Sequence, residues 1–453
     1  MRSQFIIDKT LPYQSSIKLT AKAQRALVVD EASRLARMIL ALYAFVYYIF
    51  PGILTFLFGA PLNLVLIASP NYLLGFILAI LVTGLIYWLL PRVKPPPLGA
   101  LYPAARLLFD ERVILGASLA FLYVAYQFWE NLGLSYRQTG SRISETGVVV
   151  IVLYIFQNYL IAALVVLLGR DARELKSAKL PLTFALLATV LGFFLSLQAS
   201  SNVIVMAVAG LILLRLVSNK QFLRAAEGRS SIPNYVIIGL VAIFALFVGV
   251  ANKRGVDETL FLAYNNLPEL IGIFQTRLSY HLYSASFLAD YHFTDTQLGL
   301  TALSEVLANI SHRIDVIIGN PTVFNEIGSV KRLNYELIAY YFRERTGTAP
   351  GMIGGIFYVP YGIFVLPITI FVYVVILKLI SVTVNNSRIS LFEIAFLTMF
   401  FGGIIDASID LINVFDIPFT KLFFLIFAAS IAQRRIENSN LQSVRNLQAV
   451  MRS

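Results

Sequence analysis

The chain has no cysteine and few charged residues. Only 13% of its 453 residues are Asp, Glu, Lys or Arg, whereas roughly a quarter of a typical soluble domain is charged. So few charges could not cover the water-facing surface of a chain of this size, which excludes a soluble protein. The lack of cysteine excludes disulfides and is compatible with exposure to an oxidising compartment.

Motifs of metal and nucleotide chemistry are also missing. The predicted outer loops contain no acid-x-acid pair of the kind that binds a divalent metal with a diphosphate, and no His/Asp cluster at metal-ligand spacing. There is no glycine loop of the Walker type, so nucleotide hydrolysis is not indicated. We therefore predict no metal and no cofactor, and expect arginine to neutralise any bound phosphate.

Long apolar runs dominate what is present. Hydrophobic residues make up 58% of the chain, and its mean hydropathy is +0.75. Because a bilayer core of about 30 Å needs roughly 20 apolar residues per helix, we predict an all-α polytopic membrane protein with about ten transmembrane helices. The predicted spans are 36–58, 72–90, 113–129, 148–168, 182–197, 202–216, 236–251, 353–379, 389–405 and 417–432. The run 180–217 is too long for one crossing, so we expect a reversal at residues 198–202.

The positive charges predict the orientation of these helices. With both termini cytoplasmic, 25 of the 36 Lys and Arg residues fall on the inner side and 11 on the outer side, as the positive-inside rule requires. The formal net charge of +11 is therefore mostly topogenic and indicates no nucleic-acid partner. The predicted parts are a cytoplasmic amphipathic segment (1–35), helices 1–7 (36–251), an extracytoplasmic loop (252–351), helices 8–10 (352–432) and a cytoplasmic basic tail (433–453).

The first of these parts has two interpretations. Residues 15–38 mix basic and apolar residues at helical spacing. An amphipathic helix on an anionic membrane face explains this pattern, and a solvated leader to the first span explains it equally well. No short apolar run in the first 35 residues ends in small residues, so we expect no cleaved signal peptide.

The loop 252–351 is the only long polar connection in the chain. It contains all three histidines, with ten acidic and eight basic residues. Arginine suits phosphate oxygens because its planar guanidinium presents a fork of donors. Arg277 and His281 are four residues apart, so they share a face if this stretch is helical. Each outer arginine can also be read as a surface or helix-pairing residue, but their clustering favours an anion site.

Two aspartates follow the ninth predicted span. Asp406 and Asp410 are spaced one helical turn apart at the outer membrane level, where ionisable groups usually face a cavity. The alternative is that they cap the helix end or pair with Lys421. A general base requires one well-placed group among these carboxylates or the loop histidines, and the residues alone do not choose between them.

A run of small residues closes the loop. Residues 346–355 read Thr-Gly-Thr-Ala-Pro-Gly-Met-Ile-Gly-Gly, and Tyr358 and Tyr361-Gly362 follow. This run, the number of spans, the topology and the basic start of the loop at Lys253-Arg254 resemble the oligosaccharide repeat-unit polymerases of bacterial envelopes, the O-antigen polymerase (Wzy-type) family. Many relatives carry an arginine after glycine between the fifth and sixth spans, where this chain has Gln-Ala-Ser-Ser-Asn at residues 198–202.

The resemblance implies a GT-C-like glycosyltransferase of the bacterial inner membrane, with its active site facing the periplasm. Donor and acceptor would both be glycans on undecaprenyl diphosphate within the membrane lipid, and a chain-length regulator protein would be a further partner. Arginines would stabilise the diphosphate leaving group, and a carboxylate or histidine would take the acceptor proton. The implied catalytic residues are Arg277, His281, Arg313, Asp406 and Asp410, and the implied substrate-binding residues are Arg137, Arg142, Arg254, Tyr280, Tyr335 and Glu336.

Two other functions compete with polymerisation. An O-antigen ligase-like enzyme would share the donor chemistry and differ only in its acceptor. A lipid-linked oligosaccharide flippase or secondary transporter would place charges deep inside several spans and repeat the helix pattern. The predicted spans are nearly free of charge and show no repeat, which favours an enzyme.

Overall fold

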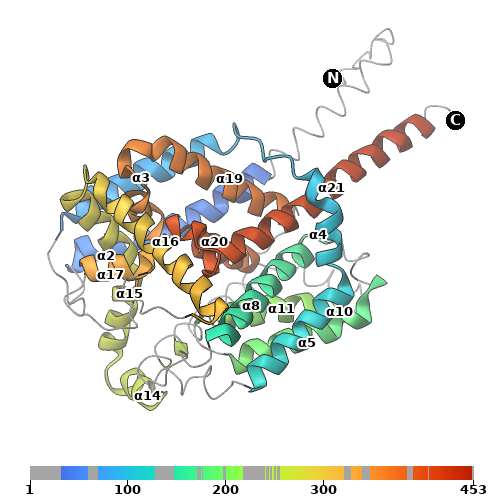
Figure 1. Ribbon diagram of the computed structural model, residues 1–453, viewed down its shortest axis with the longest axis horizontal. Coiled ribbons are helices and arrows are strands. Elements are labelled where there is room, and N and C mark those ends of the chain that lie inside the picture. The colour runs from blue at the N-terminus through green and yellow to red at the C-terminus, as the bar shows by residue number, and fades with distance from the viewer. Residues whose placement is uncertain are drawn as a thin grey trace, which may run out of the picture.

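The computed structural model shows an all-helical protein (Figure 1). The structure describes residues 32–59, 70–127, 147–170, 175, 177–196, 200–217, 240, 244, 247–248, 251, 256–320, 328–338, 347–384, 391–406 and 408–450. Every regular element within these residues is a helix, and none is a strand. This confirms the predicted all-α class.

Among the residues that the structure describes, three helices are long and apolar enough to cross a membrane. They are Ala32–Leu57, α3 (Tyr72–Leu89) and Gly362–Val384, the last formed by η5 (Gly362–Val365) and α19 (Leu366–Val384). Shorter apolar helices cover Val152–Leu168, Lys179–Leu195, Asn202–Val217 and Glu393–Ile405. Large apolar side chains such as Leu81 and Phe371 are exposed on the long helices, which suits a surface that faces lipid. These features indicate a membrane protein, and the ten spans stay a prediction.

One predicted span is interrupted. Residues 353–379 were expected to form one helix, but α18 (Gly351–Gly354) and η4 (Gly355–Tyr358) are short turns that end before the apolar helix begins at Gly362. Pro360 has no N–H to continue a helical ladder, and Tyr361 adopts a left-handed backbone with φ of 67°. The prediction of a continuous helix from residue 353 was therefore wrong.

Four helices pack together on one side of the molecule. They are α5 (Glu111–Gln127), α8 (Gly147–Leu168), α10 (Lys179–Leu195) and α11 (Ser200–Val217). Gly192 lets α10 approach α5, because a Cβ at this position would lie 2.5 Å from the Phe121 ring. A reversal was expected at residues 198–202; α10 ends at Leu195 and α11 already begins at Ser200, so the last three of these residues are helical. Most of the predicted span 236–251 lies outside the described residues.

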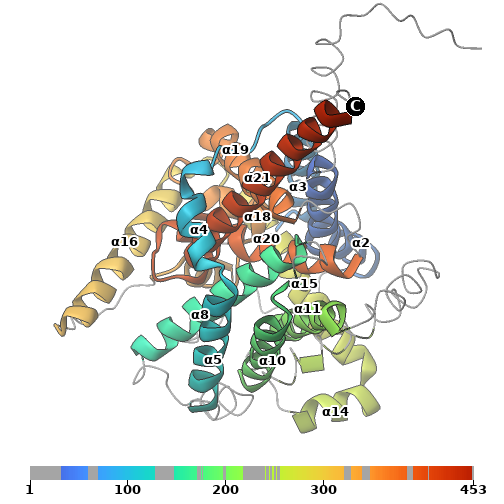
Figure 2. The same ribbon diagram turned by 90° about the vertical axis from the view of Figure 1, so that its right-hand side faces the viewer.

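A single long helix joins this group to the rest of the chain. Helix α21 (Ile417–Val450) has 34 residues and is therefore about 51 Å long. It packs against α8, α19 and the short helix α4 (Tyr102–Leu108), and its end projects from the body (Figures 1 and 2). The last predicted span, 417–432, and most of the predicted tail, 433–453, thus form one continuous helix.

The large predicted loop is helical where the structure describes it. It forms α14 (Val256–Asn265), α15 (Leu267–Tyr291), α16 (Thr296–Ile318) and α17 (Val330–Ile338). Helix α15 packs against α3, and a Cβ on Gly75 would lie 2.7 Å from the Ser286 backbone. The backbone N–H of Asn71 donates to Asp290 Oδ2 at 3.0 Å, which fastens the start of α3 to the end of α15. This loop helix is therefore packed against an apolar helix long enough to cross a membrane.

Candidate functional site

A histidine and an aspartate from distant parts of the chain meet in the interior. His281 Nε2 on α15 lies 3.5 Å from Asp406 Oδ1, and Asp406 follows the last residue of α20 (Leu391–Ile405). The hydroxyl of Tyr43 donates to the same Asp406 oxygen at 2.7 Å. The His281 and Asp406 side chains are only 11% and 18% exposed. Three elements therefore supply one buried polar cluster.

A wide turn in the first apolar helix places tyrosines around the imidazole. The helix Ala32–Leu57 contains a π turn, η1 (Phe45–Ile49), just before α2 (Phe50–Phe58). Pro51 follows this turn and has no N–H to donate to the carbonyl four residues earlier; such wide turns are frequent at functional sites. The Tyr47 ring lies 4.4 Å from the His281 ring, centroid to centroid, and the Tyr43 and Tyr48 rings lie 6.5 Å from it.

The run of small residues packs against both the imidazole and these tyrosines. Gly351 has φ of +73°, and a Cβ there would lie 2.2 Å from His281 Cδ2, so only glycine fits without strain. The backbone N–H of Met352 donates to the Tyr43 hydroxyl, and that of Ile353 to the Tyr48 hydroxyl, both at 3.1 Å. The predicted small-residue motif and the predicted His281 and Asp406 therefore lie in one place.

Asp406 also has a cationic neighbour. The Lys421 ammonium on α21 lies against Gly403, where a Cβ would be 2.6 Å from Nζ, and it interacts electrostatically with Asp406 and Asp416. The expected pairing of Lys421 with an aspartate stays a prediction. Asp406 therefore has one hydrogen-bond donor, the Tyr43 hydroxyl, and a nearby cation, Lys421.

The imidazole makes no hydrogen bond of its own. Both ring nitrogens of His281 are buried, and neither has a hydrogen-bond partner among the described residues. The 3.5 Å contact of Nε2 with Asp406 is an ion-pair distance. Because both nitrogens are buried, a substrate can reach them only after a neighbouring side chain moves.

Asp410 lies apart from this cluster, contrary to the expected helical turn between the two aspartates. Helix α20 ends at Ile405 and a separate 3-10 turn, η6 (Ser408–Ile412), carries Asp410. Its Oδ1 accepts from the Val330 N–H of α17 at 3.0 Å. Burial and the neighbouring Asp416 raise the pKa of Asp410 to about 7. The break after α20 therefore sends the two carboxylates to different partners.

The pKa of Asp410 predicts a pH-dependent stability. An unfolded aspartate titrates near ~4, so the free energy of unfolding should fall as the pH rises from about 4 to about 7 and level off above that. Asp410→Asn should remove this slope and raise the melting temperature at pH 8, because an amide can still accept from Val330. Melting of the detergent-solubilised protein at pH 5, 7 and 8 tests this. The exposed Asp257→Asn serves as control, and an equal change in both variants would contradict the prediction.

The other predicted site residues lie elsewhere or cannot be placed. The backbone of Arg277 is in α15 one turn before His281, so the stretch is helical as expected, but its side chain lies outside the described part of the structure. Arg313 donates to Asn309 Oδ1 within α16 at 3.2 Å, and that helix projects from the body (Figure 2). Tyr280 is half-buried on α15 and Tyr335 on α17. Glu336 accepts from Arg332 on its own helix at 3.3 Å. Arg137, Arg142 and Arg254 lie outside the described residues.

The tyrosines around His281 and Asp406 were not predicted from the sequence. Tyr43, Tyr47 and Tyr48 lie in an apolar run that reads simply as a membrane span. Tyr373 was missed for the same reason; its hydroxyl donates to the Met352 carbonyl at 3.1 Å. The available signal was Pro51, because a proline in a span predicts a distorted helix just before it.

Comparisons with known proteins identify no relative of this chain, so its function is inferred from the geometry of the site. No protein-family model, curated protein or solved structure matches this chain. Within the part of the chain that the structure describes, no three acidic or histidine side chains gather as they would around a metal ion. The predicted independence from metal stays a prediction.

Proposed function

We propose that this chain is a membrane glycosyltransferase that polymerises oligosaccharide repeat units linked to undecaprenyl diphosphate. The observation that carries the proposal is the His281–Asp406 pair beside the small-residue run. It supplies a base at the place where a helix of the large loop meets an apolar helix long enough to span a membrane. The lipid and the sugars come from the resemblance of the sequence to repeat-unit polymerases.

The proposed reaction needs one base and one group that stabilises charge. An acceptor hydroxyl oxygen attacks the anomeric carbon of the donor, the bond from that carbon to the diphosphate oxygen breaks, and the electron pair leaves with the diphosphate. Because Nε2 of His281 faces Asp406, Nδ1 takes the acceptor proton. Asp406, oriented by the Tyr43 hydroxyl, then stabilises the imidazolium. Because Nδ1 is buried, a neighbouring side chain would move to admit the acceptor.

The diphosphate is assigned to Arg277. It precedes His281 by one turn of α15, so the same rigid element would carry the base and the group that neutralises the leaving charge. The proposal assigns Arg313 no part in this step, because its hydrogen bond stays within α16. Arg254, Arg137 and Arg142 remain further candidates for the same anion.

Reconstitution tests the function directly. The purified protein in lipid vesicles should convert a single lipid-linked repeat unit into a ladder of products on a gel. A ladder forms only if one lipid-linked substrate can act as the donor in one molecule and as the acceptor in another. Transfer to a different glycan acceptor without a ladder would indicate a ligase, and transbilayer movement of an unextended substrate would indicate a flippase.

Removing the Arg277 side chain should slow this reaction strongly. Loss of one preorganised charge donor costs a factor on the order of 10²–10³ in rate, so Arg277→Ala should nearly abolish the ladder while the protein still accumulates. Arg277→Lys should restore only part of the rate, because an ammonium lacks the bidentate fork. The rate of chain extension measures both effects. Arg332→Ala is the matched control, since Arg332 pairs with Glu336 along α17. Equal mild losses in both alanine variants would place the diphosphate elsewhere.

A further inference from the structure

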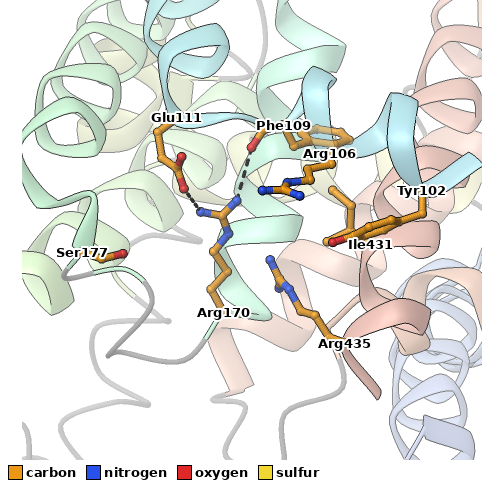
Figure 3. A pocket seen from close by; sticks show the side chains of 8 residues that line it. All are labelled: Tyr102, Arg106, Phe109, Glu111, Arg170, Ser177, Ile431 and Arg435. Atoms are coloured by element: carbon orange, nitrogen blue, oxygen red, sulfur yellow. Dashed lines mark hydrogen bonds and ion pairs between the residues drawn. The ribbon is translucent and has the colours of Figure 1, made fainter. Parts of the chain in front are cut away.

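A second basic site lies far from the histidine cluster. Three arginines and a glutamate line a pocket of about 270 Å³ between α4, α5, α8 and α21 (Figure 3). Arg435 lies 14 positions beyond Lys421 on α21, a distance of about 21 Å along the axis. The pocket therefore lies near the middle of α21, well away from Asp406, and has no part in the proposed reaction.

The arginines of the pocket come from three separate segments. Arg106 belongs to α4, Arg170 follows α8, and Arg435 lies in α21. The charge pattern of the sequence assigns all three segments to the cytoplasmic side. In Figure 3 the guanidinium groups of Arg106 and Arg435 point toward that of Arg170. The pocket lining thus contains three arginines and one carboxylate, that of Glu111, which pairs with Arg170.

Arg170 lies between the other side chains of the pocket, and one of its N–H donors has no acceptor among the described residues. Its guanidinium donates to Glu111 Oε1 at 2.5 Å and to the Phe109 carbonyl at 3.2 Å. Its side chain is only 10% exposed. Its Nε is buried without a hydrogen-bond partner among the described residues. A buried charged donor with no acceptor is costly, so this atom points to a ligand that supplies one.

From this geometry we infer that the pocket binds a phosphate group. Arginine forks match phosphate oxygens and can bind them bidentately. The formal charge of the four groups is +2 before a ligand enters, which suits an anion and disfavours a cation. Basic pockets between the cytoplasmic ends of membrane helices accept phosphorylated lipid headgroups, and a free phosphate presents the same oxygens.

Two binding measurements test the site and separate the sources of the phosphate. Native mass spectrometry of the detergent-solubilised protein, titrated with phosphatidylglycerol, gives the affinity for a lipid headgroup. Calorimetric titration with inorganic phosphate gives the affinity for the free ion. The variant Arg106→Gln/Arg435→Gln should weaken binding of the favoured probe at least about tenfold, because it removes two of the three positive groups.

Two further variants distinguish loss of the phosphate site from a general effect on the fold. Arg112→Gln alters an exposed arginine next to Glu111 that does not line the pocket, and it should bind like the wild type. The single variant Arg106→Gln, at an exposed position, replaces the double variant if that one does not accumulate. Loss in the lipid titration supports a headgroup as the ligand, and loss in the phosphate titration supports the free ion. No saturable binding of either probe by the wild type, or equal binding by the pocket variant and the wild type, would overturn the inference.

Discussion

His281→Gln should reduce chain extension by a factor on the order of 10²–10⁴, the contribution typical of a positioned general base. Glutamine keeps a polar side chain of similar reach, but its amide does not accept a proton at working pH. Asp406→Asn should also lower the rate, because the imidazolium would lose the carboxylate that lies 3.5 Å from Nε2. The rate of repeat-unit addition by reconstituted protein measures both effects.

A second loop histidine provides the control for this prediction. His292 lies just after α15 and its Nδ1 is 3.0 Å from Asp295 Oδ2, a local pairing that also lowers the pKa of Asp295. His292→Gln changes the same residue type in the same part of the chain, and we expect extension close to the wild-type rate. Normal activity of His281→Gln, or an equal loss in His292→Gln, would remove His281 from the mechanism.

Gly351→Ala should destabilise the fold by about 2–5 kcal/mol and abolish activity with it. A side chain in the left-handed region costs roughly 1–2 kcal/mol, and forcing a methyl group into a filled space costs about 1–3 kcal/mol more. The methyl would meet His281 Cδ2 and the Tyr48 hydroxyl, at 2.2 Å and 2.5 Å from an ideal Cβ. A lower melting temperature of the detergent-solubilised protein is the expected result.

Gly116→Ala is the matching substitution in open space. Gly116 lies within α5, and a Cβ there would meet no atom within 4 Å. Alanine favours a helix over glycine by about 1 kcal/mol, so this variant should melt at the same temperature or higher. If both alanine variants melted alike, the close contact between Gly351 and the imidazole would not exist in solution.

Hydropathy predicted the helical class and several helix positions well. Apolar runs were expected at 72–90 and 148–168, and α3 and α8 cover nearly the same residues. This works because a bilayer imposes one length and one polarity on each crossing helix. Hydropathy does not detect a break in the helix within an apolar run, such as the one at Pro360 and Tyr361 in the predicted span 353–379.

The parts of the candidate site were easier to predict than their arrangement. His281 and Asp406 were each selected as ionisable groups near predicted membrane ends, but nothing in one sequence shows that residues this far apart in the chain touch. The tyrosines around them lie in apolar runs that read as membrane-facing, and only Tyr47 and Tyr48 belong to the wide turn before Pro51. Whether these residues catalyse a reaction stays a prediction.

The continuous helix α21 connects the cluster around Asp406 to the arginine pocket. Lys421 near one end faces Asp406, and Arg435 farther along lines the arginine pocket. A tilt of only about 5° around Lys421 would carry the backbone at Arg435 roughly 2 Å sideways, given the rise of an α-helix. Such a tilt would move Arg435 relative to Arg106 and Arg170, which lie on other segments of the pocket wall.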